Sequence, residues 1–234
     1  IWCPGCGIGT VVNTFIRAVE GSEIDPNKIC VVSGIGCTGK VAEYLNFKSF
    51  ITTDGKIFDC AVNIRLEHVN LQVVVFSNNA DFLASGAQDF SEIGKKGVDI
   101  LLIHINNIFY TVTEHGVLPS TPFVRISFDQ NFVLPFNIPH LAKSYGAQYV
   151  ARWTPLRAGW LMHSIINAFP KKGFSVIEVI SPCLMYYVGD DRIGDAAERM
   201  EFYDRHSVMK QGECTENLDI RADDKLIIGK FVDE

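Results

Sequence analysis

The sequence lacks several features that would point to particular classes of protein. It has no excess of basic residues, because 21 lysines and arginines stand against 27 acidic residues and the net charge is −6. Nucleic-acid binding needs a basic surface, so nucleic acid is excluded as the main partner. No apolar run reaches the roughly 18–20 residues of a membrane span, and no signal peptide is recognisable. The first residue is isoleucine, so we expect further residues upstream.

Internal repeats and low-complexity stretches are also missing. Hydrophobic residues make up 47% of the 234 residues and charged residues 21%, which is typical of a globular chain with a buried core. Seven cysteines are many for this length, and their odd number does not fit a secreted disulfide scaffold. In a reducing compartment such cysteines bind metal or perform redox chemistry, so we expect a cytoplasmic protein.

Short apolar runs alternate with segments of helical spacing along most of the chain. The predicted strands cover residues 28–33, 72–76, 99–105, 148–153 and 174–180, and the predicted helices cover residues 9–19, 56–66, 82–93, 138–145 and 156–169. This pattern indicates an α/β fold, in which a parallel sheet is covered by helices on both faces. We assign residues 1–184 to this domain. Residues 185–234 are more polar and less periodic, and we expect an irregular C-terminal tail that packs on a partner subunit.

Four cysteines lie in predicted loops beside proline or glycine. Cys3 and Cys6 form a C-x-x-C in the segment WCPGCG, Cys37 ends the segment GIGC after a predicted strand, and Cys183 follows a Ser-Pro pair. Thiolates on such turns can face one metal centre. The residues alone leave three interpretations open: an iron–sulfur cluster, a structural zinc site, or thiols without metal. The other three cysteines have no such setting.

Polar residues follow two of the predicted strands, where ligands bind in open parallel sheets. Asn78 and Asn79 follow the strand that ends at residue 76, and Asn106 and Asn107 follow the strand that ends at residue 105. Asparagine is also an ordinary turn residue, and that alternative stays open. The position of these residues after two strong apolar strands favours a binding site.

Taken together, the motifs resemble the beta subunit of 2-oxoacid:ferredoxin oxidoreductases. The resemblance rests on WCPGCG at residues 2–7, SGIGCTGK at residues 33–40 and SPC at residues 181–183. It extends to about residue 202, and the segment RIGDAAERM at residues 192–200 is similar to the 2-oxoglutarate branch. The resemblance implies a thiamine-diphosphate-binding α/β fold. It also implies one [4Fe–4S] cluster, with the ligands Cys3, Cys6, Cys37 and Cys183.

The same resemblance implies a thiamine diphosphate site that is held through Mg²⁺. In relatives a Gly-Asp-Gly-Asp loop and a later asparagine bind the cation, and Asn79, Asp81 and Asn107 stand at the matching positions here. Asn79 replaces an aspartate, so we expect weaker Mg²⁺ binding unless Asp81 compensates. The residues to which the resemblance assigns cofactor contacts are Gly36, Thr38, Asn78, Asn79, Ala80, Asp81, Asn107, Phe109, Tyr110 and Thr113.

Lys40 and His115 are the candidate catalytic residues. Lys40 matches a basic residue near the substrate carboxylate in relatives, and His115 lies beside Thr113, where it can contact substrate. The other histidines are interpreted as structural or surface residues. Three segments depart from the family pattern around the cofactor and substrate: residues 54–56 (DGK), residues 61–63 (AVN) and residues 114–116 (EHG).

The resemblance therefore predicts an enzyme that oxidatively decarboxylates a 2-oxoacid similar to 2-oxoglutarate with coenzyme A, or catalyses the reverse reductive carboxylation. Electrons would pass through the [4Fe–4S] cluster to ferredoxin, and thiamine diphosphate with Mg²⁺ would carry the carbon chemistry. Alpha- and gamma-type subunits complete the active site in this family, so we expect them as partners. The alternative is an electron-transfer or scaffold subunit that keeps the cluster and has weakened or lost thiamine diphosphate binding.

Overall fold

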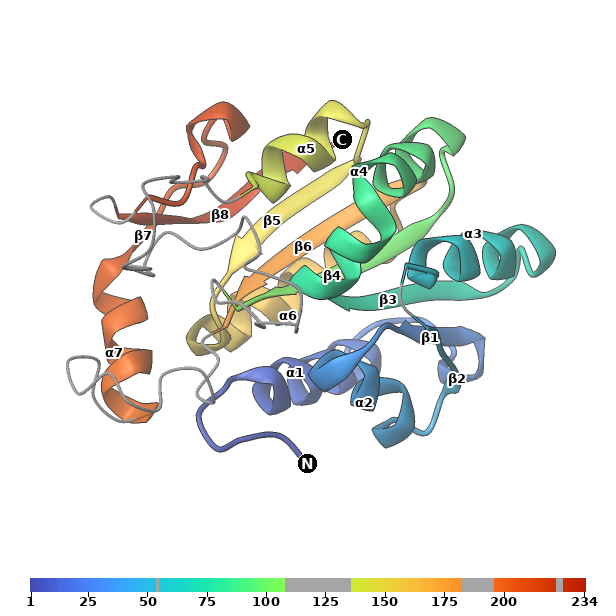
Figure 1. Ribbon diagram of the computed structural model, residues 1–234, viewed down its shortest axis with the longest axis horizontal. Helices are drawn as coiled ribbons and strands as arrows, with labels where there is room; N and C mark the ends of the chain where they lie inside the picture. The colour runs from blue at the N-terminus through green and yellow to red at the C-terminus, as the bar shows by residue number, and fades with distance from the viewer. Residues whose placement is uncertain (54, 108–135, 182–195, 222–224) are drawn as a thin grey trace.

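The computed structural model describes residues 1–53, 55–107, 136–181, 196–221 and 225–234, without the side chains of residues 82–90, 196 and 199 (Figure 1). Its centre is an eight-stranded sheet with the order β2-β1-β3-β4-β6-β5-β8-β7. The first six strands in this order are parallel to one another. They are β2 (Lys48–Ile51), β1 (Ile29–Ser33), β3 (Gln72–Asn78), β4 (Ile100–Asn106), β6 (Phe174–Ile180) and β5 (Tyr149–Trp153).

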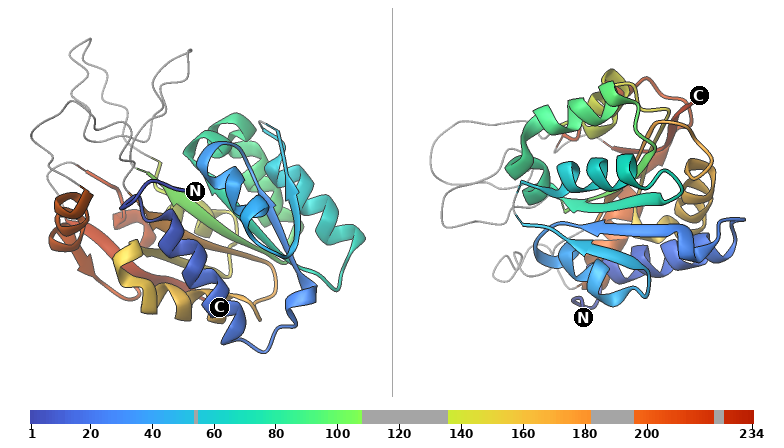
Figure 2. Two further views of the ribbon diagram at one scale, coloured as in Figure 1. Left: turned by 90° about the horizontal axis from the view of Figure 1, so that it is seen from below. Right: turned by 90° about the vertical axis from the view of Figure 1, so that its right-hand side faces the viewer.

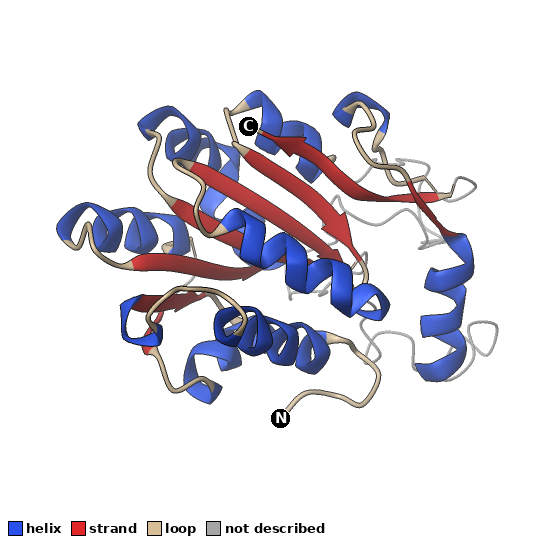
Figure 3. Ribbon diagram, turned by 180° about the vertical axis from the view of Figure 1, so that it is seen from behind, coloured by secondary structure: helices blue, strands red, loops and turns tan. Residues whose placement is uncertain are grey.

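Helices cover both faces of the sheet (Figures 1 and 3), which confirms the predicted α/β architecture. One face packs against α1 (Ile8–Glu20), α2 (Gly36–Tyr44) and α6 (Ala158–Ala168), and α1 lies beside α6 (Figure 2). The other face packs against α3 (Ile57–Glu67), α4 (Asn79–Lys96) and α5 (Ile138–Ser144). Alternate residues of a strand enter the two cores, because successive side chains point to opposite faces. In β3, Val74 and Phe76 enter the first core, and Val73 and Val75 enter the second.

The carboxyl ends of the central strands meet at one edge of the sheet, since these strands are parallel and in register. Two backbone hydrogen bonds hold the following loops against neighbouring strands. The amide of Gly34 donates to the carbonyl of Phe76 at 3.3 Å, and the amide of Ser181 donates to the carbonyl of Asn106 at 2.9 Å. Residues after β1, β3, β4 and β6 are thereby placed next to one another.

The structure differs from the predicted irregular C-terminal tail. Residues 196–221 and 225–234 contain α7 (Ala196–His206), β7 (Ser207–Met209), the short 3-10 helix η4 (Thr215–Asn217) and β8 (Leu226–Asp233). β8 pairs antiparallel with β5 and buries Ile228 and Val232, so this segment extends the sheet. The pairing of β5 with β8 shifts register between Val150 and Ala151. The shift interrupts the alternation of buried and exposed residues along β8, and this alternation is the signal by which a strand is recognised in a sequence. The boundary at residue 184 stays a prediction, as does packing on a partner.

The loops around the predicted site are more regular than the sequence indicates. Residues 36–44 form α2, where only a glycine-flanked turn was predicted, and Cys37 lies in its first turn. β3 continues to Asn78, and α4 begins directly at Asn79. A capping box explains this start: Asn78 Oδ1 accepts from the amides of Ala80 and Asp81, and the Asp81 carboxylate accepts from the amide of Asn78.

Two further 3-10 turns, η1 (Pro26–Lys28) and η2 (Pro155–Arg157), precede β1 and α6. Among the helices that the structure describes, none has the length and hydrophobicity needed to cross a bilayer.

Gly94 and Gly159 give a matched test of helix packing. A Cβ at Gly94 in α4 would overlap the backbone carbonyl of Tyr145, whereas nothing lies within 4 Å of a Cβ at Gly159 in α6. We expect Gly94→Ala to lower the free energy of unfolding by roughly 1–3 kcal/mol through overpacking. Gly159→Ala should leave it unchanged or raise it by up to about 1 kcal/mol, because alanine favours helix. Urea unfolding of both variants measures this, and equal effects at the two sites would contradict the packing between α4 and Tyr145.

Candidate functional site

Two hydrogen bonds bring three of the predicted cysteine segments to the carboxyl edge of the sheet. The indole Nε1 of Trp2 donates to the carbonyl oxygen of Cys37 at 2.8 Å. The hydroxyl of Ser181 donates to the carbonyl oxygen of Cys6. The N-terminal C-x-x-C segment therefore contacts the start of α2 on one side and the end of β6 on the other.

The turn that carries Cys3 and Cys6 is packed tightly at Gly7. Gly7 has a φ of 86°, and a Cβ there would meet the side chains of Pro155 and Ser181. Glycine is thus required both for the backbone angle and for the close approach. Within the turn, the amide of Cys6 donates to the carbonyl of Cys3 at 3.1 Å. Cys6 is buried and Cys3 is half-buried.

Within residues 1–53, 55–107, 136–181, 196–221 and 225–234, no three histidine, cysteine, aspartate or glutamate side chains form a metal site. Cys183 lies outside the described residues. The four-cysteine cluster is therefore still a prediction, and the contacts of Trp2 and Ser181 are the geometric facts that bear on it.

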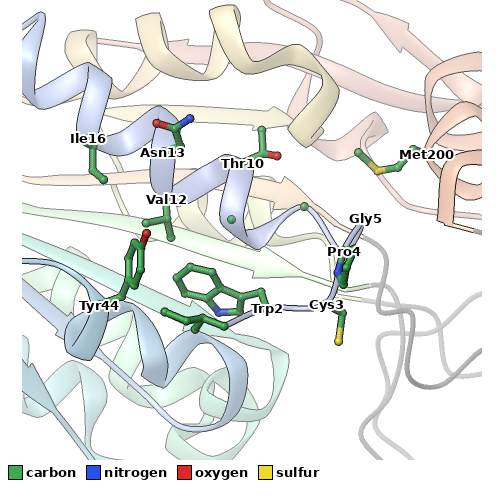
Figure 4. A pocket seen from close by; sticks show the side chains of 13 residues that line it. Trp2, Cys3, Pro4, Gly5, Thr10, Val12, Asn13, Ile16, Tyr44 and Met200 are labelled. Carbon is green, nitrogen blue, oxygen red and sulfur yellow. The ribbon is translucent and has the colours of Figure 1, made fainter.

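A pocket of about 490 Å³ lies on the outer side of the N-terminal segment (Figure 4). Trp2 and Tyr44 form one part of its lining, with their rings in edge-to-face contact at 5.3 Å. Thr10 and Asn13 of α1 and Met200 of α7 line it from the other side. Cys3 also lines this pocket, and Figure 4 shows its sulfur directed away from Met200.

Asp81 clamps the loop after β1 onto the start of α4. Its carboxylate accepts from the amide of Ile35 at 2.8 Å and from the amide of Asn78 at 2.9 Å, and the Thr38 hydroxyl lies 3.4 Å away. A Cβ at Gly34 would overlap this carboxylate, so the clamp needs glycine there. These hydrogen bonds give Asp81 a structural role. Its predicted role as a Mg²⁺ ligand stays without support from its described contacts.

Asn78 completes the same clamp from the other side. Its Nδ2 donates to the carbonyl of Ile35 at 2.9 Å and to the hydroxyl of Thr38 at 2.7 Å. Thr38 is buried, while Gly36 and Lys40 are exposed on α2. The predicted cofactor residues Gly36, Thr38, Asn78, Ala80 and Asp81 are thus brought together at the starts of α2 and α4. Helix N-termini favour anions such as phosphate.

A continuous chain of buried polar side chains crosses four strands beneath this edge. The Ser77 hydroxyl lies 2.9 Å from His104 Nδ1, and His104 Nε2 lies 3.0 Å from Asn79 Oδ1. Asn79 Nδ2 donates to Asn106 Oδ1 at 3.1 Å. The chain then continues to a charged pair.

The charged pair at the end of this chain is Glu178 with Arg152. Asn106 Nδ2 donates to Glu178 Oε1 at 2.7 Å, and Arg152 Nε donates to Glu178 Oε2 at 2.6 Å. Both charged side chains are fully buried. A second guanidinium nitrogen of Arg152 donates to the carbonyl of Leu218 at 2.9 Å.

His104 is neutral in this setting. Burial lowers the pKa of His104 from 6.5 to about 4, although the nearby Glu178 carboxylate acts in the opposite direction. The interpretation of His104 as a structural residue agrees with its burial in β4. The predicted site residues Phe109, Tyr110, Thr113 and His115 lie outside the described part of the chain.

The sequence did not single out the most buried polar residues of the site. Arg152 and Glu178 lie inside otherwise apolar strands, YVARW and FSVIEVI. Charged residues are almost never fully buried unless they are paired. Two opposite charges inside neighbouring core strands could therefore have indicated a buried ion pair. The role of Ser181 had no such signal, because it depends on tertiary contacts alone.

The pKa of His104 predicts a pH dependence of stability. The unfolded chain takes up a proton near pH 6.5 and the folded chain only near pH 4, so the unfolded state binds more protons between these values. We expect the free energy of unfolding to fall by up to about 3 kcal/mol as the pH drops through this window, and to be unaffected by His104 above it. Urea unfolding from pH 4 to pH 7 measures the slope. The slope should flatten in His104→Gln and persist in the control variant His68→Gln, whose histidine is exposed. An unchanged slope in His104→Gln would contradict the lowered pKa of His104.

Known proteins match this chain in sequence and in fold. Residues 34–179 match the family described as "Thiamine pyrophosphate enzyme, C-terminal TPP binding domain". The chain is 33% identical to the 2-oxoglutarate synthase subunit KorB of Methanothermobacter marburgensis over 236 aligned residues, which cover 100% of this chain and 82% of that protein. It is 40% identical to KorB of Archaeoglobus fulgidus over 187 residues, which cover 78% of this chain and 69% of that protein.

A solved structure shares the fold. The 2-oxoglutarate:ferredoxin oxidoreductase from Magnetococcus marinus, with 2-oxoglutarate, coenzyme A and succinyl-CoA bound, superposes with a TM-score of 0.80 at 22% identity, covering 100% of this chain and 81% of that chain. At this identity the match speaks for the fold alone. The sequence relatives and the family match together settle the family: the chain belongs to the beta subunits of 2-oxoacid:ferredoxin oxidoreductases, on the branch of the 2-oxoglutarate synthase subunit KorB.

Proposed function

We propose that the chain is the thiamine-diphosphate-binding subunit of an oxidoreductase that acts on a 2-oxoacid similar to 2-oxoglutarate. The family match supports the cofactor, and the names of the KorB relatives support the substrate class. The reaction is CoA-dependent oxidative decarboxylation or its reversal, reductive carboxylation. Alpha- and gamma-type subunits and ferredoxin are the partners, and the cytoplasm is the location.

The observation that carries this proposal is the pair of hydrogen bonds at Ser181. Its hydroxyl donates to the carbonyl of Cys6, and its own carbonyl accepts from Asn107 Nδ2 at 3.0 Å. Cys6 is a candidate cluster ligand and Asn107 a candidate cation ligand. A subunit that transfers electrons from an organic cofactor to a cluster needs the two centres close together, and one residue links both candidate sites here.

The cluster ligands in this proposal are Cys3, Cys6, Cys37 and Cys183. Cys183 follows Ser181 by two residues, and two residues span at most about 7 Å. Because Ser181 contacts Cys6, the fourth thiolate is within reach of the C-x-x-C turn. The contact between Trp2 and Cys37 supports the third ligand. Thiolates in loops next to backbone amides are the usual setting for iron–sulfur ligation.

Neutral oxygens fit the role of cation ligands in this proposal. Since Asn107 Nδ2 is used by Ser181, the Oδ1 of Asn107 has no hydrogen-bond partner among the described residues. Asn79 Oδ1 lies 3.0 Å from His104 Nε2, and an amide oxygen is a kind of ligand that Mg²⁺ takes. Both oxygens can hold Mg²⁺ together with a diphosphate, with less affinity than carboxylates. When bound, thiamine diphosphate supplies the nucleophilic carbon for decarboxylation.

The remaining roles fall to the two helix N-termini and to Lys40. The starts of α2 and α4 direct backbone amides to the same edge, where the diphosphate would bind. Lys40 is exposed on α2 and makes no ion pair within the described residues, so its ammonium is available for a substrate carboxylate or a CoA phosphate. His115, Phe109, Tyr110 and Thr113 keep the contacts that the family resemblance implies.

A second candidate function is an electron-transfer or scaffold subunit without thiamine diphosphate. The described contacts of Asp81 and Asn79 favour this alternative, because both side chains already make hydrogen bonds within the protein. Under this alternative the cysteine ligands stay the same and the strand-end site carries no cofactor.

Cys37 and Cys214 give a matched pair for the cluster, since both are exposed. In the native complex purified without oxygen, we expect Cys37→Ser to lose the four irons of this cluster and its visible absorption, because a thiolate ligand is removed. Cys214→Ser should keep both. A Cys37→Ser complex with full iron content would reject the ligand set, and zinc in place of iron would leave a colourless site.

The cofactor is tested by its content in the same native complex. We expect thiamine diphosphate in a one-to-one ratio to this chain, lost on prolonged dialysis against a chelator because neutral ligands hold the cation weakly. Iron without thiamine diphosphate in the freshly purified complex would instead establish the electron-transfer alternative.

A further inference from the structure

We propose that Trp2 is a positioning residue of the cysteine site, and that its indole N–H holds Cys37 in place for cluster binding. The inference rests on the proposed function, because it concerns the [4Fe–4S] cluster. Trp2 supplies no ligand itself, and it acts through the backbone of a residue that does.

The indole of Trp2 is held between α1 and α2. Its ring lies edge-to-face against Tyr44, the last residue of α2, with the ring centres 5.3 Å apart. A methyl group at Gly9 of α1 would touch the indole at 3.7 Å, and the ring also packs against the first core. Figure 4 shows the indole between Tyr44 and Cys3. These contacts fix the plane of the ring and therefore the direction in which its N–H points.

The N–H of this ring is the link between Cys37 and the N-terminal turn. The carbonyl oxygen of Cys37 accepts from Trp2 Nε1 at 2.8 Å. In the part of the chain that the structure describes, no other hydrogen bond reaches Cys37 from outside α2. The preceding Gly36 has a φ of 68°, and the N-cap residue Ile35 makes no side-chain hydrogen bond to the helix. The start of α2 therefore gains a fixed neighbour through the indole.

Three candidate ligands are joined into one hydrogen-bonded unit in this way. Trp2 directly precedes Cys3, and the amide of Cys6 donates to the carbonyl of Cys3 at 3.1 Å. The indole adds Cys37, which is far away in the sequence. Contacts behind the ligands orient metal sites, and their removal typically lowers metal affinity about 10–100-fold. Without the indole N–H the thiolates would remain, but Cys37 would be held less firmly.

The same N–H also acts on the charge of the cluster. The positive end of its dipole lies at the carbonyl oxygen of a ligand residue. A [4Fe–4S] cluster gains a negative charge on reduction, and the hydrogen bonds and charges around it set its potential. The indole N–H of Trp2 therefore favours the reduced state.

Trp2→Phe tests this role, because phenylalanine keeps an aromatic ring and has no donor. The matched control is Trp160→Phe. Trp160 is exposed and stacks on Trp153 at 5.8 Å, and its N–H makes no hydrogen bond within the described residues. Both variants are compared with the wild type in the native complex, purified without oxygen. Cys37→Ser identifies the electron paramagnetic resonance signal of this cluster by difference.

The two readouts are the loss of this signal to an iron chelator and the midpoint potential from a redox titration. We expect Trp2→Phe to lose the cluster roughly tenfold faster than the wild type. Its potential should also become more negative, which a merely structural role would not cause. Trp160→Phe should match the wild type in both measurements.

The inference is overturned by an unchanged rate of loss in Trp2→Phe, by a potential that does not become more negative, or by the same changes in Trp160→Phe. A wild type without iron would instead reject the proposed cluster, and the role of Trp2 with it. An iron-loaded wild type beside an unaltered Trp2→Phe rejects the role of Trp2 alone. If Trp2→Phe does not assemble, Trp2→Met removes the N–H in a second way and is measured by the same two readouts.

Discussion

A carboxylate without access to water lies in the middle of the sheet, and a guanidinium on the neighbouring strand compensates its charge at 2.6 Å. Removing either partner of such a pair leaves an uncompensated buried charge, which typically costs 3–5 kcal/mol. The pair therefore ties β5 to β6 for electrostatic reasons as well as by packing. It also fixes the side chains of Asn106 and, through it, Asn79 at the edge where α4 begins.

At the carboxyl edge of the sheet, hydrogen bonds hold the loops in place on two sides. On one side, Asp81 and Asn78 lock the loop after β1 to the start of α4, and glycine at position 34 is the condition for this close contact. On the other side, Ser181 joins the end of β6 to the N-terminal turn and to Asn107. The N-terminal segment is thus part of the strand-end site, although it precedes the first strand in the sequence.

Much of this arrangement could be predicted from the sequence, because it is local. The apolar runs of β3 and β4 and the helical spacing of α1 are strong signals, and the parallel sheet follows from their alternation. α2 was missed because its first residues, Gly-Cys-Thr-Gly, favour turns over helix. β8 was missed because its partner lies more than 70 residues earlier in the chain, with a bulge in the pairing. Neither feature has a signal within a short window.

The candidate site shows a different limit. The cysteine and asparagine motifs could be found because they are contiguous, but their meaning depends on hydrogen bonds between distant residues. Asn79 illustrates this. In the sequence it is a neutral residue at a position where the family resemblance implies a charged ligand, which suggests a loss. In the structure its amide is the central link between a histidine and a second amide. Aspartate and asparagine are nearly identical in shape, so the two residues differ at this position in charge and in hydrogen-bonding capacity.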